Sequence, residues 1–391
     1  MRVLFISNYF PGDLGPLARE LAASPENEVL FASNRQRKGY TLPGVRQVRL
    51  KSAPLFGDTP SPAPGLWEEA LKRGASGLRS LRSLRDSWGA PDMVFASLAG
   101  GAAFFAPLVF SDTFFAAYAE TGQKNFSLLP REARTAWILL QSDLFSYADL
   151  CFAMSNRQRS CFPHPLQQVI RLMPPCVDTE VFSCAAAKPW FVGPLADAPL
   201  LTLDATGLDG APLAALLRLG HAVLLSLPAC HMVMLTENSR IRGALEAVSA
   251  AWTDDCRGRF AAYASLPFER YRDLLAASSL MVCVGSGDAA ERAMLECMSC
   301  ETLLMATPEA ADFLRPDVNM LELPAHDALS AVLAALRGRP REDAPAPLAR
   351  AARRDVLAHY SETVVVPRHL AEVMTARASW KKDRRLGVFS C

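Results

Sequence analysis

The sequence predicts an α/β protein built from two doubly wound domains, and three observations support this prediction. The chain has 391 residues, which is more than one ordinary hydrophobic core accommodates. Short apolar runs alternate along it with stretches of helical period, as is typical of strands and helices in a parallel sheet. The clearest unit is the segment 268–307, where a helix, a buried strand, a polar glycine turn, a second helix and a second strand follow one another.

The first half of the chain opens with a strand and a helix. The apolar run VLFIS ends at Asn8, and Pro16 then stands at a favourable first position of a helix whose apolar face includes Leu17. Further apolar runs of strand length follow, separated by helical patterns. The strands expected in this half are residues 2–7, 29–32, 45–50, 92–96, 113–117 and 150–154.

A basic helical pattern covers residues 66–88. Its spacing predicts an inward apolar face and an outward arginine face, and a solvated surface is favoured over a partner surface for the arginines. The leucines expected inward are Leu71, Leu78 and Leu81. The arginines expected outward are Arg73, Arg79, Arg82 and Arg85.

The second half begins after a hinge. The stretch 169–182, VIRLMPPCVDTEVF, reads as a strand ended by two prolines and an Asp/Thr turn, and residues 183–199 read as a linker. We therefore expect a first domain over 1–182, a second over 183–365, and a closing segment over 366–391 that ends in a basic tail. The strands expected in the second domain are residues 200–205, 231–235, 259–263, 280–284 and 302–306.

Composition bounds the function. Half of the residues (50%) are hydrophobic and 21% are charged, which describes a soluble globular protein with a large interior. The formal net charge of +1 gives no overall field for nucleic acid, so no nucleic-acid partner is expected. The first residues read as a strand and not as a signal peptide, and the uncharged stretch 93–111 contains glycines and a proline, so no membrane span is expected.

The cysteines indicate the cellular compartment, and the basic tail bears on contact with a membrane. Several of the 10 cysteines fall in or beside apolar strands, which indicates small core residues in a reducing, cytoplasmic compartment. Cys297 and Cys300 have redox or zinc spacing, but no second pair accompanies them, and a structural role is favoured. The basic tail after Trp380 either touches headgroups at the inner face of the membrane or is a solvated chain end.

The glycine turn 285–288 and the helix after it form the strongest candidate site. Asp288 and Glu291 have the spacing of an N-cap residue and its capping-box partner. In parallel sheets, ligands bind outside the carboxyl ends of the strands, where loops and helix N-termini point. The residues from Ser286 to Glu296 lie at that edge.

The same segment also carries a resemblance to a known family. Its order of Tyr271, two leucines, an apolar strand, Ser286, an acid and then Leu-Glu-Cys-Met resembles the nucleotide-sugar site of group 1 (family 4) retaining glycosyltransferases. The resemblance implies the GT-B architecture, in which two Rossmann-like domains face a central cleft. It places the family's pair of acids on Asp288, as a catalytic residue, and on Glu296, as the ligand of the donor ribose. It also implies that Ser286 and Gly287 bind the donor.

Other stretches are similar to the same family. The opening SNYFPGDLGPLA matches its strand, glycine loop and first helix, which implies that Gly12 and Asp13 bind the donor. The hinge at 169–182 matches the interdomain stretch. Tyr-Ala-Glu, ending at Glu120, matches a Tyr-x-Glu after a strand and implies that Glu120 is catalytic, orienting an acceptor hydroxyl or stabilising charge on the sugar. Asp13 as a plain helix-start acid and Glu120 as a surface residue remain alternatives.

The sequence departs from the family where the donor diphosphate should bind. Retaining transferases typically place basic residues after the first strand of the second domain, because charge develops there on the leaving group. This chain reads DATGLDG over 204–210, without a basic residue, so the phosphate-binding region is degenerate. Arg240, with Arg242 beside it, is the candidate replacement. No Asp-x-Asp pair for a divalent ion is present in the sequence, so a metal-independent reaction without a cofactor is expected.

Three hypotheses follow. The resemblance implies a hexosyltransferase-type enzyme that moves a sugar, with retention, from a nucleotide-sugar donor to a carbohydrate, lipid-linked or protein acceptor. A catalytically degenerate GT-B protein that acts as a binding or partner subunit is the alternative, because the phosphate clamp is not visible. A GT-B-type epimerase or phosphorylase is the third, and it would need histidines and carboxylates or a cofactor lysine in the cleft.

Overall fold

The chain forms two compact units, which are described separately. The first consists of Met1–Pro174 with Val365–Cys391, and the second of Pro175–Val364. Each contains a parallel sheet with helices, so the predicted α/β fold with two Rossmann-like doubly wound domains is confirmed. The structure is a computed structural model, and the residues it describes are 1–36, 40–51, 63–98, 101, 103–119, 131–184, 198–208, 210–236, 245, 248–264, 266–285, 287–337 and 347–380.

The sheet of the first unit has seven strands in the order β3-β2-β1-β4-β5-β6-β7, and neighbouring strands pair in parallel. The chain builds outward from β1 in both directions, so the strand order switches between β1 and β4, where such sheets bind ligands. The strands are β1 (Arg2–Phe10), β2 (Glu28–Gln36), β3 (Val45–Arg49), β4 (Met93–Ser97), β5 (Phe114–Tyr118), β6 (Leu150–Ala153) and β7 (Ile170–Leu172).

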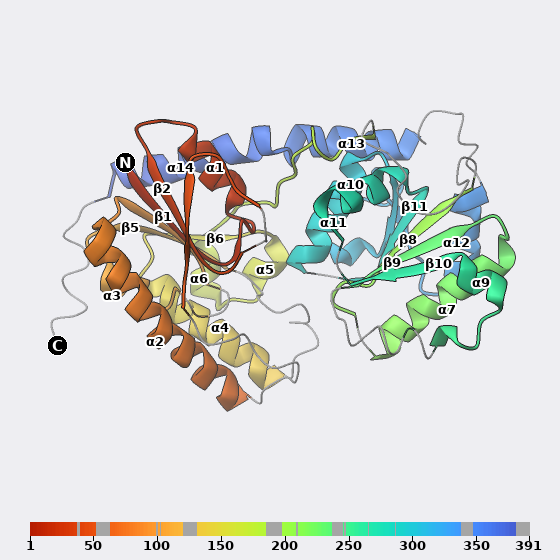
Figure 1. Cartoon of the computed structure of the whole chain (residues 1–391), viewed down its shortest axis with the longest axis horizontal. Helices are drawn as coiled ribbons and strands as arrows, with labels where there is room; N and C mark the ends of the chain where they lie inside the picture. Colours follow the sequence, from red (N-terminus) through yellow and green to blue (C-terminus); the bar gives the residue numbers. More distant parts are fainter. Residues whose placement is uncertain are drawn as a thin grey trace. The chain divides into compact units, whose positions relative to one another are not determined.

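Helices cover both faces of this sheet, with α2 and α4 on one side and α1 and α14 on the other (Figure 1). On the α2 side, Leu4 of β1 packs in one cluster with Leu81 and Trp137. On the other face, the ring of Phe5 stacks on Phe31 at 5.6 Å and on Phe95 at 4.7 Å. The helices are α1 (Gly15–Ala22), α2 (Ala63–Trp88), α3 (Ala106–Val109), α4 (Arg131–Ser146), α5 (Asn156–Ser160), α6 (His164–Val169) and α14 (Glu362–Ala378).

The first part of α2 turns a different side inward from the one predicted. Leu71, expected inside, is 45% exposed, whereas Arg73, expected in solvent, is 1% exposed. A Cβ at Gly74 would lie 2.9 Å from Phe104, so the missing side chain allows close packing here, and that contact selects the inward side. Further along, Leu81 is buried as predicted. The arginines that are exposed as predicted are Arg79, Arg82 and Arg85.

The second unit contains a six-stranded parallel sheet in the order β10-β9-β8-β11-β12-β13. The strands are β8 (Leu200–Asp204), β9 (His231–Leu235), β10 (Phe260–Tyr263), β11 (Leu280–Cys283), β12 (Leu303–Ala306) and β13 (Leu321–Glu322). Its helices are α7 (Gly210–Ser226), α9 (Asp254–Gly258), α10 (Phe268–Ala277), α11 (Asp288–Ser299), α12 (Ala328–Arg337) and α13 (Pro347–His359), and a short 3-10 helix covers Pro308–Ala310. Its order again switches beside β8, at the contact between β8 and β11.

The second unit begins before the predicted boundary at residue 182. Val177 forms a parallel bridge with Ser361, and its amide donates to the Tyr360 carbonyl at 2.9 Å. The ring of Phe182 is buried and packs edge-on against Phe268 at 5.6 Å. Because these hinge residues complete the core of the second unit, the chain divides at Pro174–Pro175. Val365–Cys391, which includes the whole closing segment expected over 366–391, is part of the first unit.

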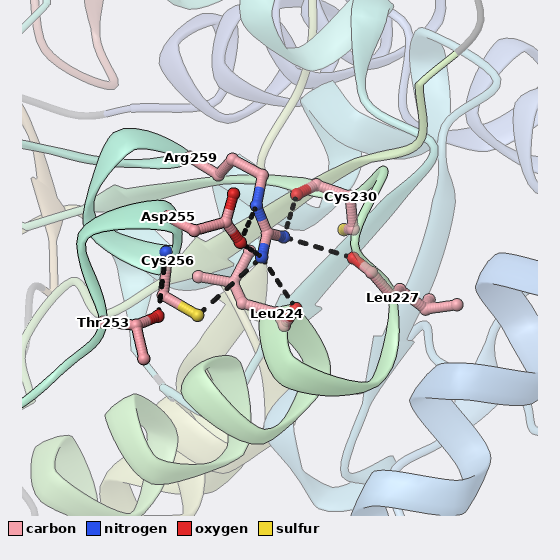
Figure 2. Close-up of polar contacts among 7 residues, drawn as sticks. All are labelled: Leu224, Leu227, Cys230, Thr253, Asp255, Cys256 and Arg259. Carbon is pink, nitrogen blue, oxygen red and sulfur yellow. Dashed lines mark hydrogen bonds and ion pairs between the residues drawn. The ribbon is translucent and has the colours of Figure 1, made fainter.

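The guanidinium group of Arg259 binds backbone carbonyls at the amino edge of the second sheet (Figure 2). Arg259, which precedes β10, donates to the carbonyls of Leu224 and Cys230 at 3.0 Å and of Leu227 at 3.2 Å, and it pairs with Asp255 at 2.6 Å. The last carbonyls of a helix have no partner within the helix. Arg259 therefore caps the end of α7 and joins it to the start of β9 and β10.

No helix in the described part of the chain combines the length and the apolar character needed to cross a membrane.

Candidate functional site

The carboxyl edge of the second sheet is shaped by two glycines between β11 and α11. Gly287, with φ of 118°, is the N-cap of α11, and only glycine adopts such a backbone conformation without strain. The predicted N-cap role of Asp288 is therefore wrong, and Asp288 is the first residue of the helix. A Cβ at Gly285 would lie 2.9 Å from the Thr206 carbonyl oxygen, so this glycine lets the turns after β11 and β8 approach each other.

Glu296 lies on α11, beyond this turn, and its side chain contacts α10. The Tyr271 hydroxyl donates a hydrogen bond of 2.7 Å to Glu296 Oε2. Tyr271 shares one face of α10 with Leu274 and Leu275, both fully buried, and their packing fixes the rotation of the helix. The helix pattern over 268–277 thus directs a tyrosine hydroxyl at the carboxylate.

The protein around Glu296 favours the neutral form of its carboxyl group more strongly than bulk water would. Burial is the main cause, and it raises the Glu296 pKa to about 7. Arg292 on the same helix and the hydrogen bond from Tyr271 act in the opposite direction, while the Asp204 carboxylate raises the pKa further. Glu296 therefore changes charge near neutral pH.

Asp204 ends β8, where the resemblance predicts that basic residues follow for the donor phosphates. Its side chain is buried, and its Oδ1 accepts a hydrogen bond of 2.9 Å from the Thr206 amide. The Cys283 thiol, on the neighbouring strand, donates to Asp204 Oδ2 at 3.4 Å. This carboxylate stabilises the turn after β8 and adds negative charge to the edge where Glu296 lies.

In the first unit, Gly12 and Asp13 form the turn between β1 and α1. Gly12 has φ of 51°, and a Cβ there would lie 3.0 Å from the Tyr9 carbonyl oxygen, so a glycine is needed. Asp13 is partly buried in the same turn. The side chain of Asn8, at the carboxyl end of β1, accepts a hydrogen bond of 3.0 Å from Asn34 on β2.

A row of serines lies at the same edge of the first sheet, and it was not anticipated from the sequence. Ser7 of β1 pairs with Ser33 of β2, and Ser97 ends β4 on the opposite side of β1. The hydroxyls of Ser33 and Ser97 are buried and have no hydrogen-bond partner among the described residues. The signal was present, because a serine directly follows each of the apolar stretches VLFI, VLFA and MVFA.

The comparisons with known proteins bear on this geometry. Residues 25–182 match the family model described as "Glycosyl transferase family 4 group". The resemblance to family 4 glycosyltransferases is confirmed. The match runs from the turn before β2 to the hinge, so it covers most of the first unit. No curated protein matches the sequence.

Solved structures share the GT-B fold along the whole chain. A sucrose-phosphate synthase from Thermosynechococcus elongatus is 14% identical, with a TM-score of 0.70 over 97% of this chain and 100% of that one. HepE from Anabaena, solved with UDP and glucose, is 11% identical, with a TM-score of 0.67 over 96% and 100%. A UDP-N-acetylglucosamine 2-epimerase is 13% identical, with a TM-score of 0.58 over 97% of both chains. At such identities these structures show the fold alone.

The remaining residues predicted from the family 4 resemblance have different outcomes. Glu120, Ser286 and Arg240, with Arg242, lie outside the described residues, as does the side chain of Asp288. Gly12 and Asp13 in the first unit, and Gly287 in the second, lie at the carboxyl edge of their sheets. Glu296 lies further along α11 and interacts electrostatically with Asp204 at that edge. Their roles in ligand binding remain predictions.

Two residues near these edges were not assigned a site role from the sequence alone. Tyr271 was part of the quoted motif, but nothing in the sequence showed that its hydroxyl meets Glu296. The hydroxyl oxygen of Tyr118, at the end of β5, lies 2.5 Å from Nε2 of His369 on α14. Burial lowers the pKa of His369 to about 3, so the imidazole ring is neutral. A partner so distant along the chain leaves no local pattern in the sequence.

Proposed function

We propose that this chain is a glycosyltransferase that moves a sugar from a nucleotide-sugar donor to an acceptor, with retention of the anomeric configuration. The observation that carries the proposal is the position of Glu296. It lies on the helix that follows the glycine turn of the second sheet, and its carboxylate is fixed by Tyr271 at 2.7 Å. The family match over residues 25–182 supports the same donor class, as does the similarity to HepE, whose structure was solved with UDP and glucose.

Glu296 would hold the ribose of the donor. An ionised carboxylate accepts hydrogen bonds from two adjacent hydroxyls, and such charge-assisted bonds are stronger than neutral ones. The turn at Gly287 opens α11, whose N-terminal amides favour a nearby anionic or polar group. Both features lie on the same helix, so a nucleotide would bind along it.

The chemical step needs little from the protein beyond binding and charge stabilisation. The bond between the sugar carbon and the diphosphate oxygen breaks, the acceptor oxygen takes its place, and a donor phosphate oxygen takes the acceptor proton. No strong side-chain base is then required. Arg240 and Arg242 are the proposed phosphate ligands, Asp288 and Glu120 the proposed catalytic carboxylates, and Gly12 and Asp13 the proposed neighbours of the sugar. We propose a reaction without a metal ion and with a carbohydrate, lipid-linked or protein acceptor.

A binding or partner subunit without catalytic activity is the second candidate, and Asp204 favours it. A buried carboxylate ends β8, beside the turn where positive charge would stabilise the diphosphate. An anion next to a diphosphate weakens its binding unless other cations compensate. This candidate predicts that sugar or nucleotide binds without turnover.

Calorimetric titration with UDP, GDP and ADP, and with their common sugar conjugates, tests the proposal first. Binding of at least one conjugate supports a donor site, and absence of binding at millimolar concentration contradicts it. Hydrolysis of the radiolabelled conjugate then separates an enzyme from a passive subunit. Glu296→Ala is expected to abolish hydrolysis, whereas Glu269→Ala, which removes an exposed carboxylate of α10, is expected to leave it unchanged.

A further inference from the structure

We propose that Tyr271 is the positioning residue of the donor site: its hydroxyl orients the Glu296 carboxylate and holds it in the charged form that accepts hydrogen bonds from the ribose. The inference rests on the proposed function in taking a nucleotide as the ligand. It goes further, because donor binding then depends on the protonation state of Glu296. Control of that state is assigned to Tyr271, which lies on a different helix.

The surroundings of Tyr271 determine which partner donates this hydrogen bond. Burial and the neighbouring Glu296 carboxylate raise the Tyr271 pKa well above its ordinary value, so the phenol keeps its proton and is the donor. The distance of 2.7 Å to Glu296 Oε2 is a normal length for a hydroxyl that donates to a carboxylate. The bond therefore stabilises the charged form of Glu296 and occupies one carboxylate oxygen, which leaves the other for a ligand.

The tyrosine ring itself is held firmly. Tyr271 packs against Phe182 with ring centroids 6.1 Å apart, and the adjoining face of α10 is anchored by Leu274 and Leu275. A donor fixed in this way loses little conformational freedom when it binds the carboxylate. Glu296 thus has one preset orientation before any ligand arrives, which lowers the entropic cost of binding.

The charged groups around Glu296 come from several elements. Arg292, on α11 itself, favours the charged carboxyl, and Asp204, at the end of β8, opposes it. The buried Cys283 and Cys300 thiols face the same region from β11 and from the end of α11, and burial raises the pKa of both, so they stay neutral. Among these groups only Tyr271 makes a described hydrogen bond to Glu296, so it is the contact that a single substitution can remove selectively.

The first test needs no ligand. In protein labelled with ¹³C at the glutamate carboxyl, the Glu296 resonance is assigned by its loss in Glu296→Gln and followed through a pH titration. Tyr271→Phe is expected to move the midpoint upward by about one pH unit, because the bond that favours the charged form is lost. Tyr360→Phe is the matched control, since Tyr360 belongs to the same hydrophobic cluster and packs on Phe313 at 5.4 Å. An unchanged midpoint in Tyr271→Phe overturns the proposal.

The second test uses a nucleotide. The tightest binder among UDP, GDP and ADP is titrated, beside its 2′-deoxy form, into wild-type protein and Tyr271→Phe across neutral to alkaline pH. Tyr271→Phe is expected to weaken binding of the ribonucleotide on the order of tenfold near pH 7, with much of the loss recovered at alkaline pH. It is also expected to narrow the difference between the ribose and deoxyribose forms, which a purely structural role would not do. Equal pH profiles for the two proteins overturn the inference.

The two proposals fail in different ways. If no nucleotide binds the wild-type protein, the proposed function fails, while the carboxyl titration still decides whether Tyr271 controls the charge of Glu296. If a nucleotide binds and neither its pH profile nor the Glu296 midpoint responds to Tyr271→Phe, the donor site stands and the positioning role is contradicted.

Discussion

Two charged side chains of the second unit, Arg259 and Glu296, are both shielded from solvent in part but differ in how the fold compensates their charge. At the amino edge, the Arg259 side chain is only 10% exposed, and its nitrogens donate to three backbone carbonyls and to Asp255 (Figure 2). At the carboxyl edge, Glu296 accepts its described hydrogen bond from Tyr271 alone, and Asp204 adds to its negative surroundings. The Arg259 guanidinium thus has several hydrogen-bond acceptors that the fold supplies, whereas the Glu296 carboxylate has one described donor.

This difference shows how to separate a structural charge from a functional one. A buried ion whose hydrogen bonds are supplied by the fold contributes to stability, and a ligand would gain nothing by approaching it. A partly buried carboxyl with a pKa of about 7 and few compensating contacts is costly to the fold, which is the common condition of residues that bind or react. The predictions below separate these two roles.

Arg259→Met should produce the largest change in stability. The carbonyls of Leu224, Leu227 and Cys230 lose their donor, and we expect the free energy of unfolding to fall by about 3 kcal/mol. Arg257→Met, on the preceding helix α9, is the control, because its half-exposed pair with Asp254 should contribute less than about 0.5 kcal/mol. Chemical denaturation measures both, and equal losses would remove the distinction between them.

Glu296→Gln should alter the pH dependence of stability. The folded-state pKa of about 7 lies above the ordinary value of 4.5, so the folded protein binds the extra proton between these values. The contribution of Glu296 to stability is therefore fully present below about pH 4.5 and is lost as the pH rises to about 7. Relative to the wild type, Glu296→Gln should gain on the order of 2 kcal/mol between these limits. Parallel stability curves for the two proteins would show that folding does not raise the pKa of Glu296.

Gly287→Ala should have a smaller effect, of about 1 to 2 kcal/mol. Its added Cβ meets nothing within 4 Å, so the cost comes from the backbone, whose φ of 118° an alanine rarely adopts. Gly258→Ala is matched to it at the amino edge, since its Cβ also meets nothing within 4 Å and its φ is not in the positive region. That control should change the free energy of unfolding by no more than about 0.5 kcal/mol. Thermal unfolding of both variants checks the difference.

Local patterns in the sequence were sufficient for most of the fold. The run LMVC of β11 and the run LLMA of β12 are apolar, short and separated by a helical period, so their place in a parallel sheet follows from the residues. The rotation of α2 was not predictable in the same way. It depends on Gly74 meeting Phe104, a contact between segments distant along the chain.

The position of the candidate site could be predicted from the sequence, but the contacts between its side chains could not. The glycine turn and Glu296 were visible, since a turn after an apolar strand marks the carboxyl edge of a sheet. The hydrogen bond from Tyr271 and the effect of Asp204 join α10, α11 and β8, and no sequence spacing reveals them. The N-cap was placed on Asp288 because acids favour that position, whereas the φ of Gly287 decides it.

The most direct test measures nucleotide affinity and unfolding free energy together in Arg259→Met and Glu296→Gln. If the carboxyl edge binds the donor, Glu296→Gln loses at least about tenfold in nucleotide affinity without loss of stability near neutral pH, and Arg259→Met loses stability while the folded protein keeps its affinity. Unchanged affinity in Glu296→Gln, with affinity lost in folded Arg259→Met, would contradict the assignment of the ligand site to the carboxyl edge.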